Sequence, residues 1–79
     1  MIMIGVDPHK RSHTAVAVDP NERVLAELQV RADRCQTERL LAWAAPFQAR
    51  TWAIEGAGGL GYLLAQQLVA AGEIVVDVP

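Results

Sequence analysis

The sequence is short of several features, and each shortage excludes a class of protein. A single cysteine, Cys35, in 79 residues excludes an internal disulfide framework and a cysteine-rich zinc module. Seven basic residues against nine acidic ones give a net charge of -2, which excludes a module that coats DNA through bulk positive charge. No apolar run approaches the roughly 18 residues of a membrane span, and the stretch 1–5 lacks the basic start of a signal peptide. We therefore expect a cytosolic protein with no membrane partner.

Apolar residues, in contrast, are plentiful. They make up 52% of the chain, which is too many for a disordered tail or a low-complexity linker. A chain of this length folds as one small domain or as a piece of a larger one, and it buries only roughly 60% of the surface that its unfolded form exposes. Its hydrophobic core is therefore expected to be small.

The first 30 residues contain three apolar segments separated by turns. An apolar run over 1–7 ends in Asp7, and a second run covers 13–19 after a polar stretch. Proline and asparagine over 19–22 are typical of another turn. Apolar and polar residues then alternate over 23–30, which indicates a strand with one face in water. The pattern predicts an antiparallel meander of three strands.

The rest of the chain alternates between helices and strands. The spacing predicts helices over 33–45 and 60–71 and strands over 50–55 and 73–78. Asp33 and Gln36 have the spacing of a capping box at the start of the first helix, and Pro46 is expected to end it. Gly72 follows the second helix, as a glycine at a helix end commonly does.

The predicted order is β-β-β-α-β-α-β, an α/β fold with a mixed sheet. Right-handed crossovers place the first strand in the centre, with the fourth strand beside it and parallel to it. The last predicted strand has no helix after it, so we expect helices mainly on one face of the sheet and an open last edge. Residues 1–79 are accordingly interpreted as the N-terminal part of one longer domain, incomplete at the C-terminus.

Two acidic residues end strands that this arrangement makes neighbours. Asp7 closes the first strand and Glu55 closes the fourth. Parallel neighbours lie about 4.8 Å apart, and ligands bind to open α/β sheets at the carboxyl ends of the strands. Two carboxylates so close repel each other unless a proton or a cation is shared, and Mg²⁺ prefers such oxygen ligands. A turn-opening Asp7 and a solvated Glu55 are the plainer interpretation of each acid alone, but the pair together favours a metal site.

Two stretches of the sequence resemble a known family. The segments GVDPHKRSHTAVAVD and WAIEGAGGLGYLLAQQL are similar to the start of the DEDD transposases of bacterial insertion sequences. This is insertion-sequence family one-ten, related to the Piv-type DNA invertases, whose catalytic domain is similar to the RuvC Holliday-junction resolvase. The motifs are the Asp-x-His-Lys stretch that begins at Asp7 and the Glu-Gly that begins at Glu55. The resemblance covers essentially the whole chain.

The resemblance implies an RNase H-like fold, which agrees with the predicted element order. It implies Mg²⁺-dependent DNA strand cleavage and transfer by a catalytic set of Asp, Glu, Asp and Asp. The first two map onto Asp7 and Glu55, which are thereby expected to be catalytic and metal-binding. The last two lie beyond residue 79 in the family, and neither Asp33 nor Asp77 is placed to replace them. A bacterial cytoplasmic location, DNA and a guide RNA as partners, an oligomeric complete protein and an inactive fragment are further expectations.

A group of basic residues follows Asp7. Lys10 belongs to the family's motif, and we expect it to contact a phosphate of the nucleic acid. His9 shares the motif but is expected to be an exposed loop residue rather than a metal ligand. For Arg11 and His13, an ordinary solvated turn is the preferred interpretation.

Three alternatives remain at this point. The stretch Gly56–Gly61 satisfies G-x-G-x-x-G after a predicted strand, with Asp77 about 20 residues on, as in NAD(P)-binding proteins. Glu55, however, would face the pyrophosphate, and the fingerprint normally opens its domain. Sugar kinases and actin-like ATPases share the first strand and hairpin, but Pro8 cannot donate the N–H that cradles their phosphate. A non-catalytic transposase remnant is the third alternative.

Overall fold

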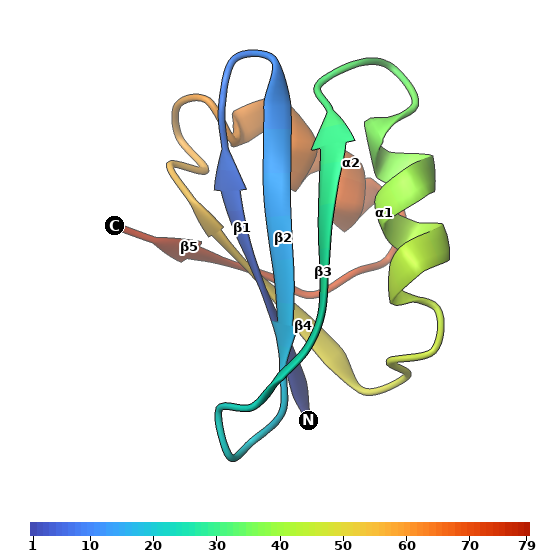
Figure 1. The fold of residues 1–79 in the computed structure, drawn as a ribbon. Helices are drawn as coiled ribbons and strands as arrows, with labels where there is room; N and C mark the ends of the chain where they lie inside the picture. Colours follow the sequence, from blue (N-terminus) through green and yellow to red (C-terminus); the bar gives the residue numbers. More distant parts are fainter.

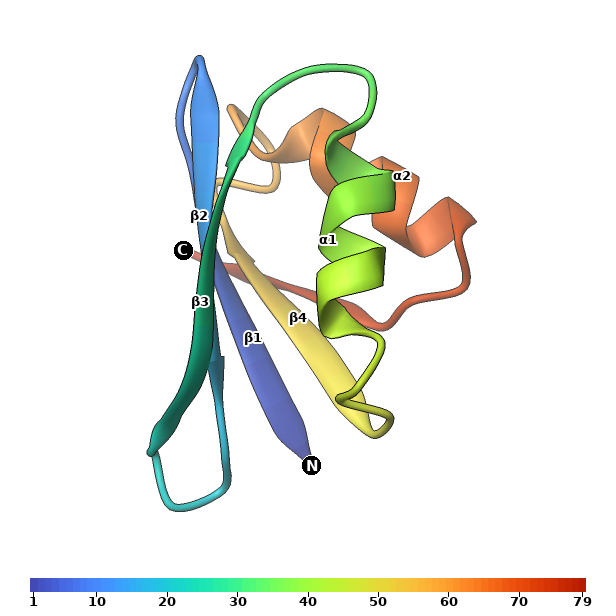
Figure 2. The ribbon, with the colours of Figure 1, turned by 45° about the vertical axis from the view of Figure 1, so that its right-hand side comes forward.

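A five-stranded sheet carries both helices on one of its faces (Figures 1 and 2). The structure is a computed structural model, and it describes all residues from Met1 to Pro79. The elements, in chain order, are β1 (Ile2–Pro8), β2 (Ser12–Val18), β3 (Val24–Arg31), α1 (Gln36–Ala44), β4 (Arg50–Glu55), α2 (Tyr62–Ala70) and β5 (Val75–Val78). The predicted order of strands and helices is confirmed.

The strands lie in the order β3-β2-β1-β4-β5, so β1 is central. β1 and β2 are antiparallel, as are β2 and β3, whereas β4 runs parallel to β1 and β5 runs parallel to β4. The meander therefore forms one half of the sheet, and two helix crossovers build the other half. Since a crossover that leaves and re-enters a sheet is almost always right-handed, this arrangement follows from the element order.

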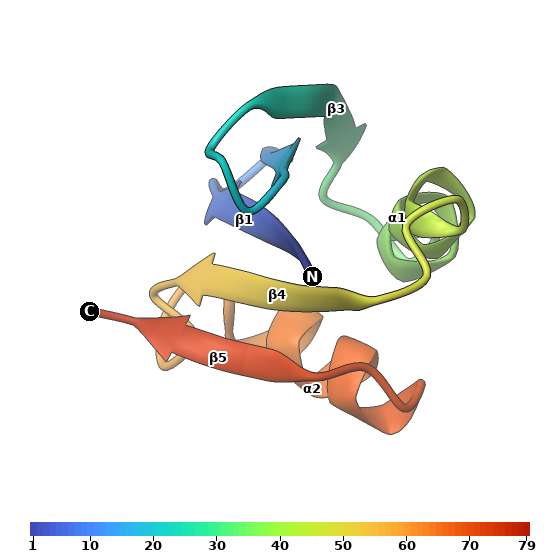
Figure 3. The ribbon, with the colours of Figure 1, turned by 90° about the horizontal axis from the view of Figure 1, so that it is seen from below.

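Alternation along the strands decides which side chains the helices cover. In β1, Ile4 and Val6 are buried under the helices, while Met3 and Asp7 are exposed on the opposite face, which we call the open face. Figure 3 shows α1 and α2 on the same side, with α1 packed nearest β3 and α2 nearest β5. The core comprises Ile4, Val6, Ala15, Ala17, Val30, Leu40, Ala44, Trp52, Ile54, Leu64, Ala65 and Leu68.

Three details of the helices differ from the sequence prediction. α1 begins at Gln36 without a side-chain cap, because Asp33 accepts hydrogen bonds from Cys35 N (2.9 Å) and from Arg39 instead of closing a capping box. α2 begins at Tyr62, two residues later than predicted, so Leu60 lies before the helix and is 58% exposed.

The two ends of α2 depend on glycine. Gly61 packs against the sheet so closely that an added Cβ would lie 2.7 Å from Ile54 Cγ2 and 2.9 Å from Pro8 Cγ. Gly72, with φ of +89°, turns the chain out of the helix as the sequence predicts, and its N–H donates to Val69 O. Neither α1 nor α2 has the length and apolar character that crossing a bilayer requires.

Candidate metal site

The register of the two central parallel strands brings the predicted acids together. Val6 pairs with Ile54, so Asp7 and Glu55 are the next residues on adjacent strands that run in the same direction. Both side chains are exposed, and both line one cavity of about 490 Å³ on the open face. We call this hollow the acid cavity. The pairing expected from the sequence therefore exists in the folded chain.

Two small residues lie beside the acids on the open face. Gly5 and Ala53 each come two positions before an acid in their strands, they pair with each other, and both line the acid cavity. A Cβ added at Gly5 would meet no atom within 4 Å. The hollow is therefore open because these two positions carry almost no side chain, and it leaves room for an ion and its other ligands beside the carboxylates.

Little positive charge neutralises the two carboxylates. His9 Nε2 lies 3.9 Å from Asp7 Oδ2, and His9 Nδ1 lies 3.2 Å from the backbone oxygen of Asp7. Glu55 forms no ion pair with any lysine, arginine or histidine. Two adjacent, weakly compensated carboxylates favour a cation between them. The chain contains no group of three or more His, Cys, Asp or Glu side chains that could hold a metal ion.

The other two acids considered from the sequence lie outside the acid cavity. Asp33 forms an ion pair with Arg39 at 3.2 Å, and its hydrogen bond from the Cys35 N–H, with help from Arg39, holds the pKa of this carboxyl below its ordinary value. Asp77 accepts a hydrogen bond from the N–H of Ala57 at 3.3 Å. Neither lines the hollow shared by Asp7 and Glu55.

The basic residues after Asp7 do not form one group. Lys10 is exposed, but it lines a different cavity, on the side of the sheet that the helices cover. His13 lies in β2 and is only 3% exposed, so its interpretation as part of a solvated turn is wrong. The cause is the alternation of β2, which directs His13 to the same side as Ala15 and Ala17.

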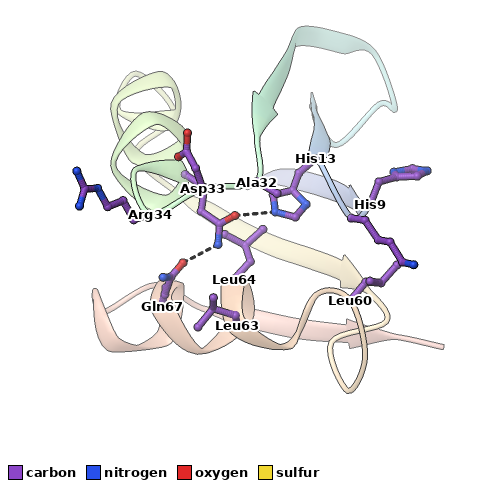
Figure 4. Close-up of a pocket in the computed structure, with 11 residues that line it drawn as sticks. His9, His13, Ala32, Asp33, Arg34, Leu60, Leu63, Leu64 and Gln67 are labelled. Carbon is purple, nitrogen blue, oxygen red and sulfur yellow. Dashed lines mark hydrogen bonds between the residues drawn. The ribbon is translucent and has the colours of Figure 1, made fainter.

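A buried polar chain holds His13 in place, and sequence reasoning missed it. His13 Nε2 lies 2.7 Å from Gln36 Oε1, and Gln36 Nε2 donates to Gln67 Oε1 at 2.8 Å (Figure 4). Because the amide of Gln36 uses its N–H toward Gln67, its oxygen faces His13 and accepts the Nε2–H of the ring. Thr37 Oγ1 also donates to Gln67 Oε1, at 2.6 Å. These bonds connect β2, α1 and α2.

The glycine-rich stretch 56–61 connects β4 to α2. The fingerprint glycines of a dinucleotide-binding fold follow the first strand of a parallel sheet, whereas these follow the fourth strand of a mixed one. The last of them, Gly61, has a packing reason to be glycine, since Ile54 and Pro8 leave no room for a Cβ. The structure thus gives Gly61 the role of letting α2 lie close to the sheet.

Comparison with known proteins identifies the family. Residues 4–79 match the transposase family DEDD_Tnp_IS110. The chain belongs to this DEDD transposase family. It is also 37% identical over 78 residues to an uncharacterized 44.8 kDa protein of insertion element IS116 from Streptomyces clavuligerus. That alignment covers 99% of this chain and 20% of the relative, so the chain spans about a fifth of the length of the curated relative it matches.

The fold has a counterpart of different sequence. The structure is similar to that of the Lmo2764 protein of Listeria monocytogenes, a proposed N-acetylmannosamine kinase, with a TM-score of 0.63. The similarity covers 98% of this chain and 34% of the other at 15% identity, so it concerns the fold alone. The element order and the mixed five-stranded sheet are those of an incomplete RNase H-like fold, as expected for the DEDD transposase family.

Proposed function

We propose that this transposase segment supplies Asp7 and Glu55 as ligands for Mg²⁺ in a centre that cuts and joins DNA strands. The observation that carries the proposal is the register of β1 and β4, which sets the two acids side by side on one cavity. Mg²⁺ takes oxygen ligands, and when bound it stabilises the negative charge that develops on a phosphodiester during strand cleavage. Asp7 and Glu55 would hold the ion at the edge of the sheet where β1 and β4 end.

The chain by itself is proposed to be inactive. Mg²⁺ needs near-octahedral coordination, and no third His, Cys, Asp or Glu joins the two carboxylates in this chain. By family resemblance, two further aspartates complete the set elsewhere in the whole protein. The same resemblance suggests DNA and a guide RNA as partners, and a complete protein that is an oligomer. We therefore expect weak metal binding from this chain and no strand cleavage.

Substitution of the acids under a metal titration tests the proposal. We expect Mn²⁺, a paramagnetic substitute for Mg²⁺, to broaden the backbone NMR signals at the ends of β1 and β4. Asp7→Asn and Glu55→Gln should each weaken this broadening strongly, because each removes one of two charged ligands. Glu27→Gln is the matched control, since Glu27 is exposed and pairs with Val16, which lies on the same face of the sheet.

Two results would count against the metal site. One is broadening that persists unchanged in both Asp7→Asn and Glu55→Gln. The other is an equal loss of broadening in Glu27→Gln, which would indicate a diffuse attraction of the cation to the acidic face. Circular dichroism of each variant checks that the fold is retained.

A further inference from the structure

Three polar side chains form a row across the open face of the sheet. Asp7 pairs with Thr14 of β2 on one side, and Glu55 of β4 lies beside it on the other. All three residues line the acid cavity. The proposed metal site uses the two acids and leaves the hydroxyl of Thr14 without a role.

The rest of the lining of the acid cavity is apolar. Val16 pairs with Gly5, which in turn pairs with Ala53, and these residues lie next to the polar row on the same face. Val6 and Val78 complete the lining. Apart from the two carboxylates, the Thr14 hydroxyl is therefore the one polar side-chain group that a molecule in this cavity can reach.

The hydroxyl of Thr14 has no partner inside the protein. The hydroxyls of the other threonines, Thr37 and Thr51, donate to neighbouring side chains at 2.6 and 3.3 Å. Gln29, which pairs with Thr14 from β3, donates instead to Ser12 Oγ at 3.4 Å. Thr14 Oγ1 is thus free to bond to a group in the acid cavity.

A magnesium ion on two carboxylates would keep water in most of its coordination sphere. Mg²⁺ prefers an octahedral set of oxygen ligands and gives up its water reluctantly. The chain has no third His, Cys, Asp or Glu to add to the two acids. A water whose lone pair faces a cation donates hydrogen bonds, and a threonine oxygen can accept one. Such partners outside the ligand set orient the ligands of a metal.

The spacing of the row suits a contact through one water. Thr14 lies one strand away from Asp7, and adjacent strands are about 4.8 Å apart. A Mg²⁺–water bond of about 2.1 Å and a hydrogen bond of about 2.8 Å together span a gap of this size. The row therefore fits a hydroxyl that holds a water of the ion better than a hydroxyl that binds the ion itself.

We propose that Thr14 is a positioning residue of the metal site, whose Oγ1 accepts a hydrogen bond from a water bound to the ion that Asp7 and Glu55 hold. The inference rests on the proposed function. By fixing the direction of this water, the hydroxyl strengthens the binding of the ion. It also assigns the water to the β2 side of the ion, because Thr14 and Glu55 lie on opposite sides of Asp7.

Removal of the hydroxyl at constant shape tests the proposal. Thr14→Val keeps the β-branched form that suits a strand but cannot accept a hydrogen bond. We expect its Kd for Mn²⁺, measured from the broadening of NMR signals at the ends of β1 and β4, to rise about tenfold. Thr14→Ser retains a hydroxyl and should keep the Kd close to that of the wild type. Ser12→Ala is the matched control, since Ser12 lies in the same strand and on the same face but outside the acid cavity.

The outcomes separate this inference from the proposed function. Weaker binding in Thr14→Val, with recovery in Thr14→Ser and no change in Ser12→Ala, supports the role of the hydroxyl. If Thr14→Val binds Mn²⁺ as the wild type does while Asp7→Asn binds it more weakly, the metal site stands and the role of Thr14 is overturned. Equal losses in Thr14→Val and Thr14→Ser also overturn that role. A wild-type Kd in Asp7→Asn overturns the proposed function, and the inference with it.

Discussion

At the scale of single residues, Gly61 shows how closely α2 approaches the sheet. A Cβ at this position would lie 2.7 Å from Ile54 Cγ2, 2.9 Å from Pro8 Cγ and 3.0 Å from the oxygen of Glu55. We predict that Gly61→Ala destabilises the fold by about 1–3 kcal/mol, because the helix must move away from the strand ends. Urea unfolding followed by circular dichroism measures the change. Loss of Mn²⁺ broadening in the same variant would show that the displacement reaches Glu55.

Gly58 provides the control for this prediction. It lies in the same glycine-rich loop, and a Cβ added there would meet no atom within 4 Å. Gly58→Ala should therefore leave the free energy of unfolding almost unchanged. If Gly58→Ala and Gly61→Ala destabilise the protein equally, the loss reflects the flexibility of the loop and not the contact of Gly61 with the sheet.

Single residues also show which positions in the fold could be predicted from the sequence and which could not. Asp7 and Glu55 could be placed because strand period, parallel pairing and crossover handedness are properties that a sequence reveals. His13 could not be placed as easily, because the three basic or histidine neighbours before it suggested a solvated turn. Counting in steps of two from Ala17 and Ala15 would have assigned it to the buried face.

At the scale of elements, the bond between Arg50 and Glu73 connects three parts of the chain. Arg50 Nε donates to Glu73 Oε1 at 2.7 Å, and Trp52 Nε1 donates to the same oxygen at 2.6 Å. Arg50 Nη1 also donates to the backbone oxygens of Ala44, the last residue of α1, and of Phe47 in the following loop, both at 3.1 Å. The end of α1, the start of β4 and the loop before β5 are therefore held together at one point.

This network predicts a loss of stability in acid. The hydrogen bond from Arg50, followed by that from Trp52, holds the pKa of Glu73 below its ordinary value of 4.5. Because the folded-state pKa is the lower one, the charged carboxylate stabilises the protein above pH 4.5, and this contribution is lost as the pH falls toward the folded-state value. The gap in unfolding free energy between wild type and Glu73→Gln should narrow over that range.

The measurement is urea unfolding of both proteins at neutral pH and at pH values below the ordinary pKa of glutamate. Glu38→Gln is the control, since Glu38 is exposed on α1 and forms no ion pair. The unfolding free energy of Glu38→Gln should therefore stay close to that of the wild type at every pH. A gap for Glu73→Gln that stays constant as the pH falls would show that the charge of Glu73 contributes nothing to stability.

The start of α1 shows why element boundaries were predicted less well than element order. The spacing of Asp33 and Gln36 fits a capping box, yet Gln36 bonds to His13 and Gln67, which lie 23 and 31 positions away along the chain. A local pattern cannot reveal partners so distant, because their proximity exists only after the sheet and both helices have assembled. Order and type of element depend on periodicity, which is local, and were predicted correctly.

At the scale of the whole molecule, the sheet has helices on one face only (Figure 2). The open face carries apolar side chains that water reaches: Met3 is 38% exposed, Leu25 46% and Val76 42%. β5 is also an edge strand, with one side unpaired. Exposed apolar surface next to an unpaired strand edge promotes association between copies of a protein. We therefore predict that the chain self-associates as its concentration rises.

Val76→Lys tests this prediction, because it places a positive charge on the edge strand and on the open face together. Charged side chains on edge strands block strand pairing between molecules, so the variant should remain monomeric at concentrations where the wild type associates. Sedimentation velocity over a range of concentrations measures the difference. Val69→Lys is the control: Val69 is 58% exposed on α2, on the opposite side of the sheet, and its variant should associate as the wild type does. If Val69→Lys alone abolishes association, the contact is made by the helix layer, and the open face plays no part in it.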